Sequence, residues 1–255
     1  MLSLKPVVAA PAPCPICEAP APLFGVVDFN RNCEIPDGVK LPLAGAPVYY
    51  RRCTACGFLF TDAFADWSHD DYKAHIYNDG YAAVDPDYQV SRPRGNAALV
   101  IKLFGDDRAN RRVLDFGGGN DFLCAALREA GFGAAVTYDP FVPEHAAPPE
   151  GTWDLITCFE TIEHMPDPVA GIGLIVDKLA DPGLVLFSTL LQPADIETRG
   201  VGWWYVAPRN GHVSMFSRDA MIKAFAKHGC QTGSFNENMH VAFRTLPDYA
   251  KHLFK

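Results

Sequence analysis

The chain has 255 residues, of which 49% are hydrophobic and 20% are charged, values typical of a globular protein that buries a core. Acidic residues outnumber basic ones by 30 to 22, and the formal net charge of −8 disfavours a nucleic acid partner, because phosphates are bound by clustered Lys and Arg. The sequence has no apolar run of about 18 residues and no leader-like start. We therefore expect a cytoplasmic protein without a membrane partner.

Four of the eight cysteines form two Cys-x-x-Cys pairs, Cys14 with Cys17 and Cys53 with Cys56. Four thiolates make a closed tetrahedral shell, which is typical of a structural zinc site. The pairs therefore predict a zinc ribbon. Disulfides and unligated thiols are the alternatives, and disulfides are disfavoured because nothing in the sequence indicates secretion. Cys33 is expected to be an isolated thiol, since the other four complete the shell.

Short strands are expected at residues 47–52 and 58–61, on either side of the second cysteine pair. The following segment carries Trp67, Tyr72, His75, Tyr77, Tyr81 and Tyr88. These rings are too numerous for a solvated linker. Either these rings pack the predicted zinc ribbon against a larger domain, or some of them line the opening of a substrate site. Residues 91–107 then show the apolar spacing of an amphipathic helix.

A strand, a glycine turn and a helix follow one another in the second half of the chain. The order is a strand at 111–116, the turn Gly117, Gly118 and Gly119, a helix at 122–130 and a strand at 135–138. The second strand ends at Asp139. This order indicates an open parallel α/β sheet, in which nucleotides bind at the carboxyl ends of the strands. Asp139 is then placed to accept hydrogen bonds from ribose hydroxyls.

The residues after the turn decide between nucleotides. A dinucleotide fingerprint requires a third glycine where this chain has Phe122, and Asp121 would lie near the pyrophosphate. Both features disfavour NAD and FAD, and with them a nicotinamide oxidoreductase. S-adenosylmethionine has an adenosine but no phosphate, and its positive charges tolerate an acidic loop. The remaining alternative is a tight turn that binds nothing.

Three stretches resemble class I S-adenosylmethionine-dependent methyltransferases. Residues 113–119 (Val-Leu-Asp-Phe-Gly-Gly-Gly) resemble the first motif of that family, residues 153–168 its fourth strand and the motif that follows, and residues 183–189 its fifth strand. The two cysteine pairs add a resemblance to a bacterial subgroup with an N-terminal zinc-ribbon module. The resemblance implies an α/β fold, with a Rossmann-like, doubly wound, mostly parallel sheet, an antiparallel C-terminal hairpin and the small zinc-ribbon module.

The resemblance also implies the organisation and the reaction. Residues 1–66 would form the zinc-binding module, residues 67–110 a connecting aromatic and helical segment, and residues 111–255 the methyltransferase core. Several members of the subgroup modify sugars or secondary metabolites. We therefore expect an enzyme that transfers a methyl group from S-adenosylmethionine to a small-molecule hydroxyl of that kind, with zinc in a structural role. The alternative is a zinc-ribbon protein that binds or modifies RNA.

The family pattern assigns the cofactor contacts residue by residue. Asp115 would position the methionine ammonium, the three glycines would approach the methionine and ribose, and Asp139 would hold the ribose. Phe159 and Glu160 would lie beside the cofactor. The chain departs from the family at residues 140–152, which contain four prolines and leave little room for the usual third strand. The contacts to adenine are therefore not predicted.

Methyl transfer to a hydroxyl also requires a base with a pKa near neutrality. The candidate catalytic residues are His164 with its neighbour Glu163, and His212. Either histidine could instead only fix a loop, and a Glu and His pair could bind a divalent metal. The rings of residues 203–205 (Trp-Trp-Tyr) could stack on an acceptor or pack as a lid.

Overall fold

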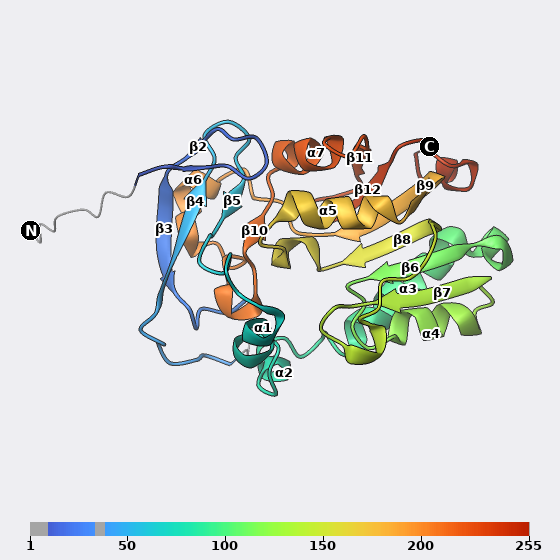
Figure 1. The fold of residues 1–255 in the computed structure, drawn as a ribbon, viewed down its shortest axis with the longest axis horizontal. Coiled ribbons are helices and arrows are strands. Elements are labelled where there is room, and N and C mark those ends of the chain that lie inside the picture. Colours follow the sequence, from blue (N-terminus) through green and yellow to red (C-terminus); the bar gives the residue numbers. More distant parts are fainter. Residues whose placement is uncertain (1–9, 34–38, 255) are drawn as a thin grey trace, which may run out of the picture.

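The computed structural model describes residues 10–33 and 39–254. Its largest sheet has the strand order β11-β12-β9-β8-β6-β7 (Figure 1). The strands are β6 (Arg112–Phe116), β7 (Ala134–Tyr138), β8 (Trp153–Phe159), β9 (Leu179–Ser188), β11 (Gln231–Ser234) and β12 (Met239–Phe243). Strands β7, β6, β8 and β9 are parallel, whereas β12 and β11 add an antiparallel hairpin. The predicted α/β fold class is confirmed.

Helices cover both faces of this sheet (Figure 1). They are α3 (Ser91–Phe104), α4 (Phe122–Glu129), α5 (Pro168–Asp177) and α7 (Arg218–Ala226). Alternate side chains of β9 point to opposite faces, as in any strand. Leu184 and Leu186 belong to the core cluster of α3 and α4, whereas Val185 and Phe187 belong to that of α5 and α7. Residues 184–187 of this strand are therefore apolar on both faces, as expected of a strand segment buried between two layers of helices.

Helices α5 and α7 both begin at a residue whose side chain caps the helix. Asp167 caps α5 by accepting a hydrogen bond of 3.0 Å from the Ala170 amide, and Pro168 occupies the first turn. Ser217 caps α7 by accepting a hydrogen bond of 3.0 Å from the Ala220 amide. Each cap satisfies an amide that has no partner within its helix.

The connection between β7 and β8 is short. Residues 140–152 contain only the 3-10 turn η2 (Pro143–His145) and no strand. The absence of a third strand from this connection was expected from its prolines. Strand β7 is therefore the edge of the sheet, and the chain returns from Asp139 to the start of β8 without forming another strand.

The N-terminal part forms a separate antiparallel sheet in the order β10-β5-β4-β3. Its strands are β3 (Leu23–Asp28), β4 (Pro47–Arg52), β5 (Leu59–Phe60) and β10 (Ser214–Met215), beside a small hairpin of β1 (Ala12–Pro13) and β2 (Pro20–Ala21). Strand β10 comes from the second half of the chain and pairs with β5. The two halves thus share a sheet, and the division into three segments stays a prediction.

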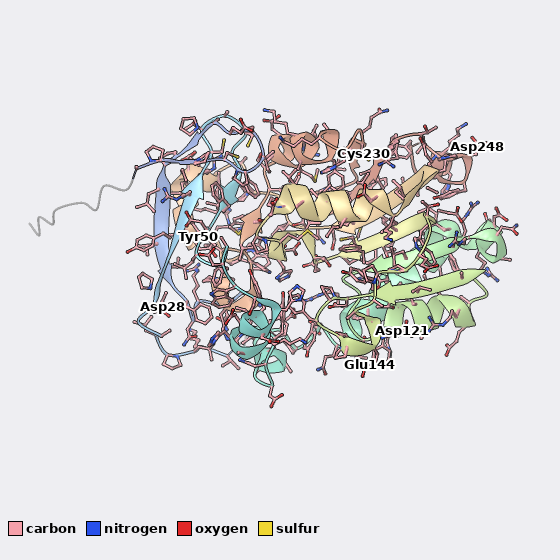
Figure 2. All side chains as sticks on the ribbon, viewed as in Figure 1. Asp28, Tyr50, Asp121, Glu144, Cys230 and Asp248 are labelled. Carbon is pink, nitrogen blue, oxygen red and sulfur yellow. The ribbon has the colours of Figure 1, made fainter. Side chains whose placement is uncertain are left out.

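The aromatic segment joins the two sheets. It contains α1 (His69–His75) and α2 (Tyr81–Val84). Trp67 and Tyr72 pack with Phe64, with ring centroids 4.6 and 6.4 Å from that ring. Phe64 and Tyr72 belong to the same buried cluster as Val48, Tyr50 and Leu59, and Trp67 packs against that cluster, so these rings attach the aromatic segment to the N-terminal sheet. Buried Tyr50 (labelled in Figure 2) donates a hydrogen bond of 2.8 Å to the carbonyl of His212.

The remaining elements are short. They are α6 (Ile196–Arg199) and the 3-10 helices η1 (Gly105–Asn110), η3 (Ile162–His164), η4 (Gly200–Gly202), η5 (Pro208–Asn210) and η6 (Asp248–Phe254). Within residues 10–33 and 39–254, no helix has the length and apolarity that a bilayer-crossing helix requires.

Candidate functional site

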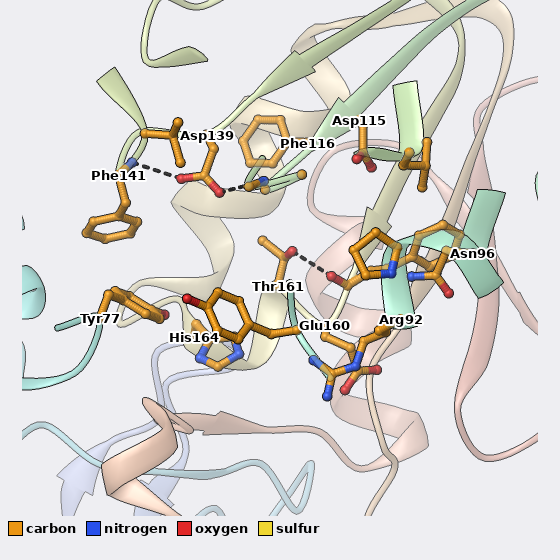
Figure 3. A pocket seen from close by; sticks show the side chains of 18 of the residues that line it. Tyr77, Arg92, Asn96, Asp115, Phe116, Asp139, Phe141, Glu160, Thr161 and His164 are labelled. Atoms are coloured by element: carbon orange, nitrogen blue, oxygen red, sulfur yellow. Dashed lines mark hydrogen bonds between the residues drawn. The ribbon is translucent and has the colours of Figure 1, made fainter. Parts of the chain in front are cut away.

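A cavity of about 390 Å³ lies at the carboxyl ends of β6, β7 and β8 (Figure 3). It is lined by the glycine turn after β6, by the residues after β7 and by the turn after β8. Side chains from α2 and α3 line it as well. This is the position at which open α/β sheets bind their ligands.

The glycine turn and Asp139 meet directly at this cavity. The amide of Gly119 donates a hydrogen bond of 3.0 Å to Asp139 Oδ2, and the amide of Phe141 donates one of 2.8 Å to Oδ1 (Figure 3). A carboxylate has about four lone-pair positions, so two remain for a ligand. Burial raises the pKa of Asp139 above its usual value. The structure therefore brings together the two elements that the sequence singled out.

The glycines differ in what surrounds them. A Cβ atom on Gly117, whose φ is +76°, would lie 2.5 Å from the Thr161 side chain, and one on Gly118 would lie 2.2 Å from an Asp115 carboxylate oxygen. At Gly119, with φ +61°, a Cβ atom would meet nothing within 4 Å. Gly117 and Gly118 are thus packed tightly against neighbouring side chains. Gly119 has no neighbour in the position of a Cβ atom, so a ligand can approach its backbone.

Asp115 lies beneath the same turn and is almost fully buried. Its Oδ1 accepts a hydrogen bond of 2.6 Å from the Thr157 hydroxyl. Burial raises the pKa of Asp115 to about 7. A cationic group in the cavity would favour the ionised carboxylate, because opposite charges in a poorly solvated site attract strongly.

Phe159 and Glu160, at the end of β8, also line the cavity. Glu160 has a φ of +49°, in the left-handed region that a residue with a side chain seldom adopts. Two hydrogen bonds with Ser188 hold it there. The Glu160 amide donates to Ser188 Oγ at 2.9 Å, and the Ser188 hydroxyl donates to Glu160 Oε1 at 2.7 Å. Strain of this kind is common at functional sites.

Some lining residues were not predicted from the sequence. Arg92 and Asn96 face the cavity from α3, one turn apart on the same side of the helix (Figure 3). Arg92 is held by two hydrogen bonds to the Asp85 carboxylate, of 2.7 and 3.0 Å. Tyr77 and Tyr81 line the cavity too. Part of the aromatic segment therefore faces the cavity, while Trp67 and Tyr72 pack near the N-terminal sheet. The spacing of Arg92 and Asn96 was the available signal, but a solvated helix face shows the same spacing.

A second cavity of about 360 Å³ adjoins the first. The two share Arg92, Asn96 and Glu160 as lining residues. Trp204, which is 45% exposed, lines the second cavity, whereas the neighbouring Trp203 is buried. The three consecutive rings predicted to stack or to form a lid are therefore divided, with Trp204 facing open space.

Glu163, His164 and His212 lie together beside the first cavity. Nδ1 of His164 donates to the Gly211 carbonyl at 3.1 Å, and Nδ1 of His212 donates to the Tyr205 carbonyl at 2.8 Å. The Tyr205 hydroxyl donates to Glu163 Oε1 at 2.6 Å. The centroids of the two imidazole rings are 5.1 Å apart. His164 lines the cavity, while Glu163 and His212 lie behind it (Figure 3 shows His164).

Strand β10 brings these residues together. The Val213 amide donates to the Glu163 carbonyl at 2.9 Å, and the Ser214 hydroxyl donates to the Met165 carbonyl at 2.7 Å. These bonds join the turn after β8 to the segment that enters the N-terminal sheet. The position of His212 therefore depends on the N-terminal module as well as on the main sheet.

Burial favours the uncharged form of all three side chains. It lowers the pKa of His164 well below its usual value and that of His212 to about 4, and it raises the pKa of Glu163 to about 8. The histidines differ in this from the base with a pKa near neutrality that we expected. Their neutral rings keep one nitrogen lone pair each, which can accept a proton or bind a cation.

The four predicted cysteine ligands also converge. The Sγ atoms of Cys14 and Cys56 are 3.7 Å apart, and those of Cys17 and Cys53 are 3.4 Å apart. Zinc–sulfur bonds of about 2.3 Å in a tetrahedron place sulfur atoms about 3.8 Å apart. The Cys56 amide lies 3.4 Å from Cys53 Sγ, where it can donate to a thiolate. The four thiols therefore fit a tetrahedral metal ion.

Comparison with known proteins places the main sheet in a family. Residues 88–234 match the family model described as a methyltransferase domain, which leaves both cysteine pairs outside the match. A ubiquinone biosynthesis O-methyltransferase from Ralstonia nicotianae is 29% identical over 147 residues, 47% of this chain and 62% of that protein. One from Xanthomonas oryzae is 33% identical over 135 residues, 42% of this chain and 56% of that protein.

A solved structure supports the fold assignment. An O-methyltransferase family protein from Burkholderia thailandensis aligns with a TM-score of 0.52 and 14% identity, over 71% of this chain and 64% of that one. At this identity the likeness shows the fold alone. The chain spans about half to three fifths of the length of the two curated relatives, so their activity and acceptors do not carry over as established properties.

Proposed function

Because the chain belongs to the family of proteins with a methyltransferase domain, we propose that it transfers a methyl group from S-adenosylmethionine to a hydroxyl of a small-molecule acceptor. The observation that carries this proposal is the cavity in which Gly119 and Asp139 meet. The cavity has a carboxylate for ribose, a second carboxylate for an ammonium group and an open glycine backbone between them. These are the groups that an unphosphorylated adenosine with a charged amino acid tail requires.

Each predicted contact has a supporting feature. Asp139 would accept hydrogen bonds from the ribose hydroxyls through its two free lone pairs. Gly119 leaves room for the ligand to lie against the backbone. Asp115 would pair with the methionine ammonium, and Phe159 and Glu160 would lie beside the cofactor. The bound cofactor supplies a methyl group already activated by a sulfonium. The protein then has to align the acceptor and exclude water.

We place the adenine against the residues that follow Asp139. Pro140, Phe141 and Val142 line the cavity where other family members have a third strand. Phe141 packs against Tyr77 with ring centroids 4.9 Å apart and ring planes inclined by 50°, so the two rings form an aromatic wall in which each ring presents its own face. Stacking on such a wall would replace the contacts that the shortened connection removes.

The acceptor would occupy the second cavity, which meets the first at Arg92, Asn96 and Glu160. Exposed Trp204 offers a face for stacking on a sugar or an aromatic ring. The curated relatives are O-methyltransferases, which supports oxygen as the methylated atom. A sugar or secondary-metabolite hydroxyl remains our expectation for the acceptor. Loss of its proton would be assisted by the catalytic candidates Glu163, His164 and His212.

We assign a structural zinc ion to Cys14, Cys17, Cys53 and Cys56. The short sulfur–sulfur distances and the predicted zinc ribbon both support this assignment. The ion would stabilise the two cysteine turns that flank the small N-terminal sheet. The N-terminal sheet includes β10, which directly follows His212. Zinc would therefore affect the proposed active site only by stabilising this sheet, not by contacting the ligands.

Calorimetric titration with S-adenosylhomocysteine tests the proposed function. We expect one ligand per chain for the wild-type protein and binding about 100-fold weaker for Asp139→Asn, which loses charge-assisted hydrogen bonds to the ribose. Asp107→Asn is the matched control, because Asp107 pairs with Arg111 before the start of β6, whereas the cavity lies at the other end of that strand. Unchanged affinity in a folded Asp139→Asn protein would refute the ribose assignment, and tight binding of NADH would refute the proposed function.

A further inference from the structure

We propose that Glu163, His164 and His212 together bind a divalent metal cation at the edge of the cofactor cavity. One ligand atom from each of the three side chains lies within 4.8 Å of the other two. Metal–ligand bonds of about 2.1 Å bring ligand atoms to about 3–4 Å from each other, so small side-chain rotations would close the site. Two imidazoles and one carboxylate form a donor set that suits zinc, iron, cobalt, nickel and manganese.

The Glu163 carboxylate is the first independent observation. Its side chain is 0% exposed, and Oε1 accepts the Tyr205 hydroxyl, but Oε2 has no hydrogen-bond partner within the described residues. The nearby Thr189 hydroxyl is close enough to lower the pKa of Glu163, yet it too makes no hydrogen bond of normal geometry there. An unpaired buried carboxylate oxygen is costly, because it has lost its water without replacement. A cation would satisfy it.

The two imidazole rings are the second observation. A backbone carbonyl can only accept a hydrogen bond, so the Nδ1 atoms of His164 and His212, which contact the carbonyls of Gly211 and Tyr205, carry their protons. The Nε2 atom of each ring therefore has the free lone pair. Metal-binding histidines commonly have this arrangement, in which the second ring nitrogen donates to a carbonyl and fixes the ring.

The position of the cation site beside the cofactor cavity suggests that the cation activates the acceptor hydroxyl, a role that rests on the proposed function. His164 lines the cofactor cavity, so open positions on the cation would face the acceptor. A cation that contacts the acceptor hydroxyl lowers its pKa, and the hydroxyl proton passes to solvent water. The oxygen electron pair then forms the bond to the methyl carbon. The methyl–sulfur bond breaks with its electron pair on sulfur, leaving S-adenosylhomocysteine.

Titration of the full chain with Mn²⁺, followed by the electron paramagnetic resonance signal of the free ion, tests the site. We expect one Mn²⁺ per chain and at least tenfold weaker binding in Glu163→Gln, which keeps the shape of the side chain but removes its charge. The control is His228→Asn, because the His228 ring contacts the Val169 carbonyl outside the cluster. Zinc content is measured throughout, so that exchange at the cysteines is not counted as binding.

Thermal unfolding gives a second readout that does not depend on activity. Mn²⁺ should raise the Tm of the wild-type protein and of His228→Asn but not that of Glu163→Gln, because a ligand of the folded state stabilises that state. If Glu163→Gln does not fold, His212→Asn is used in its place.

Two results would overturn the proposal. One is the absence of saturable Mn²⁺ binding up to about 1 mM, an affinity too weak for a built site. The other is equal binding by the wild-type and ligand variants. S-adenosylhomocysteine affinity is measured on the same samples. Intact cofactor binding without Mn²⁺ binding would remove the cation site alone, whereas loss of cofactor binding in the wild-type protein would remove the proposed function.

Discussion

Asp115 is the residue that we expect to set the pH dependence of cofactor binding. Burial raises its pKa to about 7, so below that pH the free protein holds a neutral carboxyl group at the cavity. An ammonium group binds the ionised form, and binding must then release the proton. The affinity for S-adenosylmethionine should therefore rise about tenfold per pH unit from about pH 5 to 7 and level off above pH 7.

Calorimetry across this pH range measures the effect in the wild-type protein and in Asp115→Asn. The variant should bind more weakly at pH 7.5 and should show no rise in affinity between about pH 5 and 7, because its amide does not titrate. The same slope in both proteins would show that another group is responsible.

Gly118 and Gly119 should respond differently to alanine. A Cβ atom on Gly118 would lie 2.2 Å from an Asp115 oxygen and 2.9 Å from Thr137, so Gly118→Ala should lower the free energy of unfolding by about 1–3 kcal/mol. Gly119→Ala meets no protein atom and should cost about 1 kcal/mol for its positive φ. Its methyl group would point into the ligand space.

Urea unfolding and calorimetry on the two variants separate these effects. Gly118→Ala should lose more stability, whereas Gly119→Ala should lose cofactor affinity beyond what its stability loss explains. The reverse pattern would show that the open side of the turn is not the ligand side.

Single residues were predictable where a local pattern fixes them. Gly117, Gly118, Gly119 and Asp139 follow two strands whose ends must lie at one edge of the sheet, and the structure brings them together. Arg92 could not be found in this way, because its place in the cavity depends on how α3 is rotated against α4. That rotation is set by packing between segments that are distant from Arg92 in the sequence.

At the scale of elements, the turn that contains Cys53 and Cys56 is bonded to segments from the second half of the chain. The Ser217 hydroxyl, which caps α7, also donates to the Cys56 carbonyl, and the Gln192 amide group donates to the Gly57 carbonyl at 2.8 Å. The second cysteine turn is therefore tied both to α7 and to the loop after β9. Loss of the metal should loosen these contacts together.

Cys56→Ser tests this dependence. We expect zinc well below one equivalent per chain by elemental analysis and a Tm lowered by several degrees, because a structural metal contributes free energy of folding. Cys230→Ser is the control, since Cys230 is a buried thiol after α7 that does not belong to the group of four converging cysteines, and the variant should keep zinc at one equivalent. Full zinc in Cys56→Ser would exclude Cys56 as a ligand.

The elements of the main sheet were mostly predictable, and those that join the two sheets were not. Helices α5 and α7 have caps and apolar periodicity that the sequence displays directly. Strand β10 has two residues, and its partner β5 lies more than 150 positions earlier in the chain. A pairing of this kind has no local signal. Helix α2 likewise has no side-chain cap and is held by the packing of its buried Tyr81 against Tyr77 and Tyr88. Helix α1, in contrast, begins with a capping box formed by Ser68 and Asp71.

At the scale of the whole molecule, the ligand space lies where three parts of the chain meet. The main sheet supplies the glycine turn and both carboxylates, and the aromatic segment supplies Tyr77 and Tyr81. The segment before β10 brings His212 beside His164. Figure 3 shows Tyr77, Asp115, Asp139 and His164 around this space. The glycine turn and Asp139 follow consecutive strands of the main sheet, so their meeting could be predicted from the order of elements in the sequence. The part that carries His164 and Trp204 depends on how the two sheets pack against each other, which explains why the sequence offered its histidines and the rings of residues 203–205 only as alternatives.

The central claim is that the cavity between the glycine turn and Asp139 holds S-adenosylmethionine. A crystal structure of the full chain with S-adenosylhomocysteine measures this most directly. The account predicts ribose hydroxyls within about 3 Å of the Asp139 carboxylate. It also predicts the adenine against Phe141 and the amino group beside Asp115. A ligand bound elsewhere, or a ribose that does not contact Asp139, would contradict it.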